Sequence, residues 1–167
     1  NTTGSTNVAI GRKTMCTNTT GANNTAIGNQ SLEQNTTGCC NTAIGRQALK
    51  ANTTGNINVA VGTDALLSNT TGCCNTAIGR NALDANTTAN NNTAVGLASM
   101  SNNTTGTANT ALGKDSLATN STGDSNVAVG NCALAVNTVS ENTAVGTSAL
   151  IANTTGTRNV AVGFSAM

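Results

Sequence analysis

Thiols are the most reactive side chains in this chain of 167 residues. They can form disulfides, stay reduced or bind a soft metal ion. Two vicinal pairs occupy equivalent places in two nearly identical segments, NTTGCCNTAIGRQALKA and NTTGCCNTAIGRNALDA. What these thiols can reach depends on how the repeated segments are stacked. The six cysteines are Cys16, Cys39, Cys40, Cys73, Cys74 and Cys132.

No other residue type is arranged for catalysis. The chain has no His, its carboxylates do not cluster at one repeat position, and it has no single Gly-rich loop. Acid–base and nucleophilic catalysis need positioned groups of these kinds. We therefore expect a protein that is not an enzyme, with no catalytic residue, no cofactor and no metal site.

The composition also argues against two classes of partner. Charged residues make up 8% of the chain, the net charge is +1, and Phe164 is the one aromatic residue. Without a basic stripe or an aromatic platform, nucleic-acid binding is not favoured. No apolar stretch approaches the roughly 18 residues of a membrane-spanning helix, so we expect no membrane insertion.

The whole chain is built from one repeat. The consensus is N-T-T-G-x-x-N-[TV]-A-[IV]-G-x-x-A-L-x-x, and its step is 17 residues except for one step of 16, where NTVSEN replaces the usual turn. We interpret residues 1–167 as a single repeat domain of ten units and as a segment of a longer fibre. The glycine that closes the strand motif marks each unit: Gly11, Gly28, Gly45, Gly62, Gly79, Gly96, Gly113, Gly130, Gly146 and Gly163.

Each unit predicts one coil of an all-β, parallel β-roll or β-solenoid. N-T-A-I-G, with β-branched residues two apart between Asn and Gly, is typical of a short strand that ends in a turn. The x-A-L-x segment predicts a second extended piece, and N-T-T-G-x-x-N predicts a turn. The unit is too short for the paired-helix repeats, which need about 33 residues or more. Ten coils stacked about 4.8 Å apart make a rod about 50 Å long.

Stacking turns each consensus position into a column. Two columns are apolar throughout, and we expect them to form the core: the column from Ile10 to Val162 and the column from Met15 to Met167. Side chains alternate along a strand, so the invariant Ala directly before the Ile or Val is expected on the opposite face. We predict that this Ala column is an assembly face between chains: Ala9, Ala26, Ala43, Ala60, Ala77, Ala94, Ala111, Ala128, Ala144 and Ala161.

Two Asn columns, one beginning NTT and one preceding the strand, predict ladders of amide hydrogen bonds from coil to coil. The eight NTT sequences are also glycosylation sequons. Bulky glycans one coil apart would collide, so the sequons are interpreted as a by-product of turn chemistry. Arg12, Arg46 and Arg80 follow the strand glycine in alternate coils and could form a spaced basic row, although solubility is the simpler explanation.

Stacking also limits which cysteines can form a disulfide with one another. Equivalent thiols two coils apart are separated by about 9.6 Å, whereas the Cα atoms of a disulfide rarely lie more than about 7 Å apart. An intrachain bond between the pairs is therefore excluded. We favour interchain disulfides in an oxidising, extracellular setting. Free or vicinally bonded thiols are the first alternative, and zinc is the second. The candidates for interchain bonds are Cys39, Cys40, Cys73 and Cys74.

The segment NVAIG at 7–11 resembles the head repeats of trimeric autotransporter adhesins. The longer unit, N-T-T-G-x-x-N-T-A-I-G-x-x-A-L, is similar to repeats of phage tail-fibre and bacterial surface proteins. The resemblance covers all ten units and implies a left-handed parallel β-roll, three chains around one axis, and a role in attachment or as a fibre shaft. The 17-residue step, Thr at positions such as Thr25, and the cysteines depart from the head repeats.

Two functions follow as hypotheses. The first is a structural or adhesive fibre segment: an extracellular homotrimer on a cell surface or virion, with a surface receptor or glycan as a candidate further partner. The second is an ice-binding β-solenoid, because flat, Thr-rich, weakly charged solenoids can order water. A T-x-T array on a strand would favour ice binding. Here the Thr residues are adjacent in a turn and the strand reads T-A-[IV], so the fibre is favoured.

Overall fold

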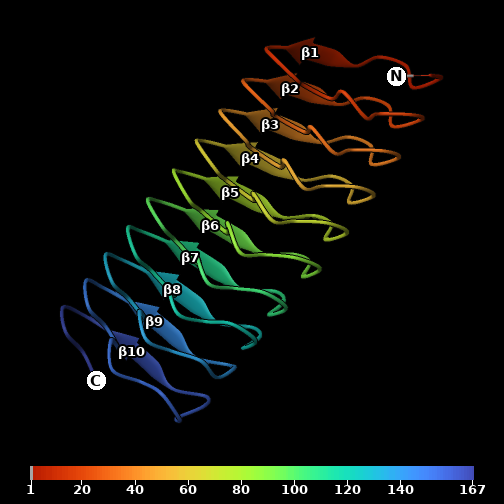
Figure 1. Cartoon of the computed structure of the whole chain (residues 1–167). Coiled ribbons are helices and arrows are strands. Elements are labelled where there is room, and N and C mark those ends of the chain that lie inside the picture. Colours follow the sequence, from red (N-terminus) through yellow and green to blue (C-terminus); the bar gives the residue numbers. More distant parts are fainter. Residues whose placement is uncertain (1) are drawn as a thin grey trace.

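The computed structural model describes residues 2–167, and within them the chain is all-β. Ten strands of three residues pair in parallel, each with the next in the chain, to form one ten-stranded sheet (Figure 1). The strands are β1 (Val8–Ile10), β2 (Thr25–Ile27), β3 (Thr42–Ile44), β4 (Val59–Val61), β5 (Thr76–Ile78), β6 (Thr93–Val95), β7 (Thr110–Leu112), β8 (Val127–Val129), β9 (Thr143–Val145) and β10 (Val160–Val162).

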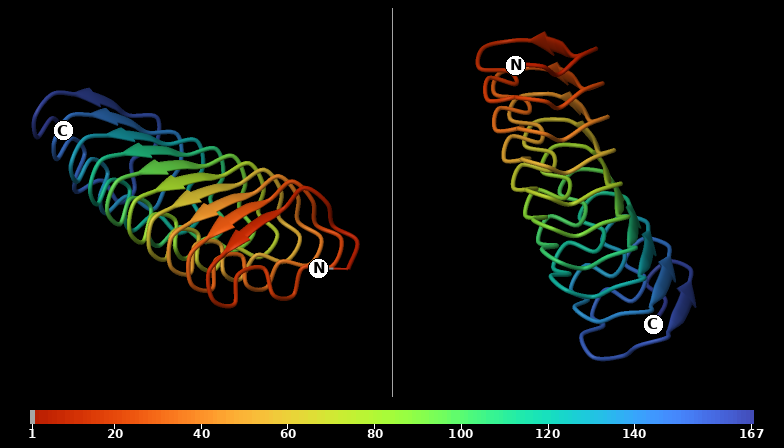
Figure 2. Two further views of the ribbon diagram at one scale, coloured as in Figure 1. Left: turned by 90° about the horizontal axis from the view of Figure 1, so that it is seen from above. Right: turned by 90° about the vertical axis from the view of Figure 1, so that its right-hand side faces the viewer.

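The coils stack in strict register, as the repeat predicts. Ala26 pairs with Ala43 and Ala43 with Ala60, so every consensus position forms a column. The step of 16 residues does not disturb this register, because Ala128 still pairs with Ala144. The views of Figure 2 show the strands aligned along one side of the rod and the turns looping around the other. The predicted β-solenoid is confirmed.

The prediction of a second strand in each coil is wrong. The G-x-x-A-L segment forms turns, and two of its non-glycine residues adopt positive φ, for example Gln47 at 59° and Leu49 at 51°. The left-handed region costs a non-glycine residue roughly 1–2 kcal/mol. Hydrogen bonds between coils hold this conformation: Leu49 N–H donates to the carbonyl of Ala65 at 3.0 Å, and Gln47 N–H donates to that of Asn29 at 2.9 Å.

The core contains the Leu/Met column from Met15 to Leu134, as predicted, with Leu150 partly buried against it; Met167, the last member of the predicted column, is 99% exposed, and the Ile/Val column is not in the core. Leu32, Leu49 and Leu66 are fully buried, whereas Ile44 is 37% exposed and Ile78 is 40% exposed. Ile and Val point away from the interior on every strand. Because side chains alternate along a strand, the Ala between the two outward residues must point inward.

The prediction that the Ala column is an assembly face is therefore wrong. The Ala column lines the inside of the coil, where it cannot contact another chain. Ala9 alone is exposed, because no coil precedes it. The buried members are Ala26, Ala43, Ala60, Ala77, Ala94, Ala111, Ala128, Ala144 and Ala161.

The narrow interior explains why the smallest side chain is the one that faces it. A Cβ placed on Gly38 would lie 2.4 Å from Asn35 Oδ1 and 2.5 Å from the carbonyl oxygen of Gly55. The strand glycines are equally restricted: Gly45 has φ of 135°, and a Cβ there would lie 2.5 Å from the oxygen of Gly62. In so thin a coil, a strand can place only Ala inside, and the larger Ile or Val is accommodated outside.

Buried amide ladders fill the rest of the interior, as the Asn columns predicted. Asn35 Nδ2 donates to Asn18 Oδ1 at 2.7 Å and to the carbonyl of Gly38 at 3.0 Å. In the second ladder, Asn41 Nδ2 donates to the carbonyl of Gly55 at 2.8 Å, and Asn41 N–H donates to Asn24 Oδ1 at 2.9 Å. The asparagines that begin the NTT sequons from coil 2 to coil 7 are buried in this network, so the folded coils cannot present them to a glycosyltransferase.

Candidate functional site

The outward side of the ten-stranded sheet is a regular surface that every coil contributes to. We call it the strand face and define it as the first and third residues of the ten strands. Neighbouring coils are about 4.8 Å apart, and the two columns are about 6.7 Å apart along each strand. The first column is Val8, Thr25, Thr42, Val59, Thr76, Thr93, Thr110, Val127, Thr143 and Val160, and the second is Ile10, Ile27, Ile44, Val61, Ile78, Val95, Leu112, Val129, Val145 and Val162.

The strand face is uncharged, and its second column is apolar along its whole length. None of the strand residues is charged, and the second column consists entirely of Ile, Val and Leu. Ile44, Ile78 and Leu112 are 37–47% exposed, although each lies between neighbours on both sides. Continuous exposed apolar patches on soluble proteins mark interaction surfaces. The strand face therefore has the properties of a contact surface.

The two threonines of each NTTG turn have different roles. The first is partly buried and bonds to the next coil: Thr36 Oγ1 donates to the carbonyl of Thr53, and Thr53 Oγ1 donates to that of Thr70, both at 3.0 Å. The second, such as Thr54 or Thr71, is exposed. This division holds in the inner turns, whereas both threonines are exposed in the turns at 18–21 and 153–156, near the two ends of the chain.

The four candidate cysteines also divide into two kinds. Cys39 is partly buried, and its Sγ accepts the N–H of Ala22 at 3.4 Å. One coil on, Asn56 fills the same position and its Oδ1 accepts the N–H of Cys39 at 2.7 Å, so this column caps the neighbouring turn. Cys73 repeats the arrangement of Cys39, with its Sγ accepting the N–H of Asn56 at 3.3 Å.

Cys40 and Cys74 are exposed and lie two coils apart in one column, with Ile57 between them. All six thiols are free in the structure, so it contains no vicinal bond. Among residues 2–167, no three Cys, Asp or Glu side chains lie close enough together to hold a metal ion. Of the four candidates, Cys40 and Cys74 are the accessible ones, and their interchain pairing stays a prediction.

Most charged residues lie on another side of the coil, which we call the charged edge. It consists of the first, second and fifth positions after the strand glycine. Ion pairs link neighbouring coils there, as between Arg46 and Asp64 at 2.9 Å. Asp124, Glu141 and Arg158, in the turns of the last three coils, lie outside it. Its members are Arg12, Lys13, Glu33, Arg46, Lys50, Asp64, Arg80, Asp84, Lys114 and Asp115.

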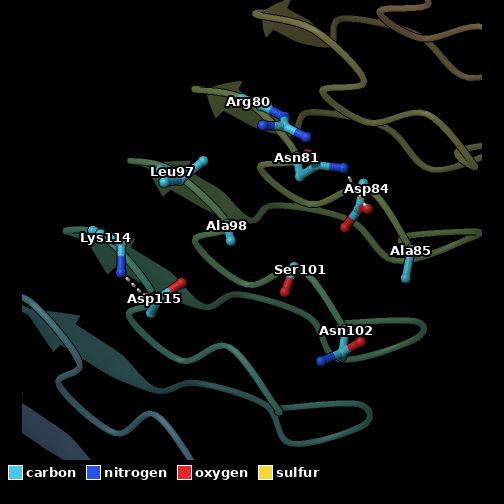
Figure 3. A pocket seen from close by; sticks show the side chains of 10 residues that line it. All are labelled: Arg80, Asn81, Asp84, Ala85, Leu97, Ala98, Ser101, Asn102, Lys114 and Asp115. Atoms are coloured by element: carbon cyan, nitrogen blue, oxygen red, sulfur yellow. Dashed lines mark hydrogen bonds and ion pairs between the residues drawn. The ribbon is translucent and has the colours of Figure 1, made fainter.

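The charged edge contains a shallow hollow of about 570 Å³, drawn in Figure 3. Arg80, Leu97 and Lys114 follow one another along one side, and Asp84 and Asn102 lie opposite. Desolvation by burial raises the pKa of Asp84, and the hydrogen bond that its Oδ2 accepts from Asn81 at 3.1 Å opposes this shift only in part. The other oxygen, Asp84 Oδ1, is buried and has no hydrogen-bond partner among residues 2–167.

Sequence reasoning identified Arg80 but missed this hollow and the outward direction of the Ile/Val column. The signal for the strand face was present: in T-A-I the small residue is invariant and its neighbours vary in size, which is the pattern of a narrow interior. No helix long and apolar enough to cross a membrane occurs within residues 2–167. No protein-family model, curated protein or solved structure matches the chain.

Proposed function

We propose that this chain is a segment of a structural fibre that associates with copies of itself along the strand face and serves in attachment at a cell surface or virion. The observation that carries the proposal is the continuous Ile/Val column of the strand face, which runs along every coil and has no charged residue beside it on the strands. The fold supplies a rod whose interior is filled by its own Leu, Ala and Asn columns. Such a rod extends by adding coils.

A second copy is the occupant that suits the strand face best. The surface is periodic at one coil, and only another solenoid repeats with the same period over the same length. Contact between Ile44 and Ile78 of neighbouring chains would remove apolar area from water at about 25 cal/mol per Å². A parallel arrangement repeats that contact in each coil. The adhesin resemblance implies threefold symmetry. The contact residues that we propose are those of the strand face and not those of the Ala column.

The native mass of the protein tests this proposal. Three chain masses of 16.4 kDa are expected under reducing conditions, because apolar contact and not disulfide bonding holds the chains together. Non-reducing conditions would add covalent links through Cys40 or Cys74 if interchain bonds form. A single chain mass at micromolar concentration would refute self-association.

Ice binding remains the second candidate, because one observation favours it. Six of the ten residues in the first strand-face column are Thr, so hydroxyl and methyl groups alternate with Ile or Val on a flat, uncharged surface. This array presents at most one Thr per strand, whereas a T-x-T array, with two Thr per strand, would favour ice binding more strongly. Both functions need the same face, so they exclude one another. Thermal hysteresis from a monomeric protein would support ice binding, and its absence from a trimer would support the fibre.

A further inference from the structure

A row of cations runs along the charged edge. The position directly after the strand glycine is basic in coils one, three, five and seven, and uncharged in the coils between. Because the coils stack in register, these side chains form one straight row with a spacing of about 9.6 Å. All of them are exposed. The row consists of Arg12, Arg46, Arg80 and Lys114.

The row retains positive charge that the chain does not neutralise. Arg12 and Arg80 form no ion pair with any of residues 2–167. Arg46 pairs with Asp64, and Lys114 pairs with Asp115, yet the side chains of Arg46 and Lys114 stay 55% and 56% exposed. Exposed ion pairs contribute only about 0–1 kcal/mol. A carboxylate from a ligand can therefore compete for both cations.

The hollow between Arg80 and Lys114 adds a wall that suits a sugar ring. Leu97 lies between the two cations along the row and is 44% exposed (Figure 3). Asn81 and Asn102 also line the hollow and supply amides, and the carboxylates of Asp84 and Asp115 line it too, so Arg80 and Lys114 are the groups that must hold the anion. An apolar surface beside amides is the combination that a sugar needs, because its ring has C–H groups on its faces and hydroxyls around its edge.

The spacing of the cations in the row does not fit nucleic acid. Phosphates follow one another about every 3.4 Å along a strand of duplex DNA, far closer than the cations of this row. Single-stranded nucleic acid also needs aromatic stacking platforms, and Phe164 is the chain's one aromatic residue. In contrast, an extended disaccharide is close to two coils in length. A polymer with one anion per disaccharide therefore matches the row.

We propose that the row of Arg12, Arg46, Arg80 and Lys114 binds a linear polysaccharide that carries one carboxylate per disaccharide. Each carboxylate pairs with one cation, and guanidinium groups do so through two parallel hydrogen bonds. The intervening sugar lies over the uncharged residue between two cations, Leu97 in the case of the hollow. Each contact is weak, and four contacts on one rigid rod add through avidity.

Three polymers test the proposal at physiological ionic strength: hyaluronan with one carboxylate per disaccharide, polygalacturonate with one per sugar, and neutral dextran. The full chain should bind hyaluronan more tightly than either of the others. Replacing Arg80→Asn together with Lys114→Asn should weaken hyaluronan binding roughly tenfold or more, because half of the avid contacts are lost. Asn is already present at this position as Asn29 and Asn131. The matched control, Lys50→Asn with Arg158→Asn, removes the same charge outside the row and should bind normally.

A charge-conserving variant distinguishes spacing from net charge. Arg80→Asn with Thr63→Arg moves one cation by a single coil, keeps Leu97 and leaves the net charge at +1. It should lose affinity for hyaluronan and keep its weaker affinity for polygalacturonate. The proposal is overturned if hyaluronan binds no better than dextran, or if the relocated cation binds hyaluronan as well as the native row. Circular dichroism of each variant confirms that the solenoid is folded.

Discussion

At the residue scale, the order of Ala and Ile along each strand decides which side chains form the core. Ranking residues by hydrophobicity alone places Ile inside, but the coil is too narrow for it. The Leu column and both Asn ladders were predictable from the sequence, because their identities hardly vary and each has a role that stacking explains. The inward Ala was missed, because its direction depends on the width of the coil, and the one signal of that width in the sequence was the invariance of the Ala.

Ala43 and Ile44 give the sharpest comparison between the inside and outside of the coil. Replacing Ala43→Val forces two extra methyl groups into a filled interior and should lower the free energy of unfolding by about 1–3 kcal/mol. Replacing Ile44→Thr substitutes, on the partly exposed strand face, a residue type common in the adjacent column, and should cost under about 1 kcal/mol in the single chain. Urea titration under conditions where the chains are dissociated measures both. A larger loss for Ile44→Thr would place Ile in the core after all.

Asp84 makes stability depend on pH. Burial raises its pKa above the ordinary value of 3.8, so folding favours the protonated form. That contribution is complete below pH 3.8 and is lost as the pH rises through the higher pKa of the folded state. An Asp84→Asn variant has no such loss. Its melting temperature relative to wild type should rise between pH 3.8 and neutral pH; a difference that shrinks over this range would contradict the assignment.

At the element scale, one coil is the unit of structure, and its strand was predictable while its second half was not. β-branched residues two apart before a glycine predict a strand. The G-x-x-A-L segment has no glycine at its third and fifth positions, so nothing local predicts positive φ at Gln47 or Leu49. Hydrogen bonds from the coils on either side impose that conformation, and they exist only after stacking.

Removal of one whole coil should therefore be tolerated. Deleting residues 52–68 joins the coil that ends at Ala51 to the coil that begins at Asn69 and keeps every column continuous. We expect a folded solenoid with a lower free energy of unfolding, since stability in repeat proteins is close to a sum over repeats and their interfaces. Deleting residues 52–60, about half a coil, breaks every column and should abolish the fold. Thermal melts followed by circular dichroism compare the two, and equal behaviour would show that the coil is not the unit.

At the scale of the whole molecule, the fold divides its surface between an uncharged strand face and a charged edge. Periodicity predicted the rod and the number of coils. It could not assign the assembly surface, because Ala, Thr and Ile columns repeat equally well and only the direction of their side chains separates them. The proposed fibre needs the strand face, while the proposed polysaccharide site uses the charged edge, so one molecule could assemble and bind at the same time.

The most direct test of the fibre proposal is the native mass of an Ile44→Asp, Ile78→Asp variant beside that of the wild type. Both changes place a carboxylate on the strand face, where a neighbouring chain would have to desolvate it. We expect wild type to be trimeric and the variant to be a single folded chain with an unchanged circular-dichroism spectrum. Thr37→Asp with Thr71→Asp alters exposed turn residues of the same two coils and should stay trimeric. A variant that remains as large as wild type, or a wild type that is monomeric, would contradict assembly through the strand face.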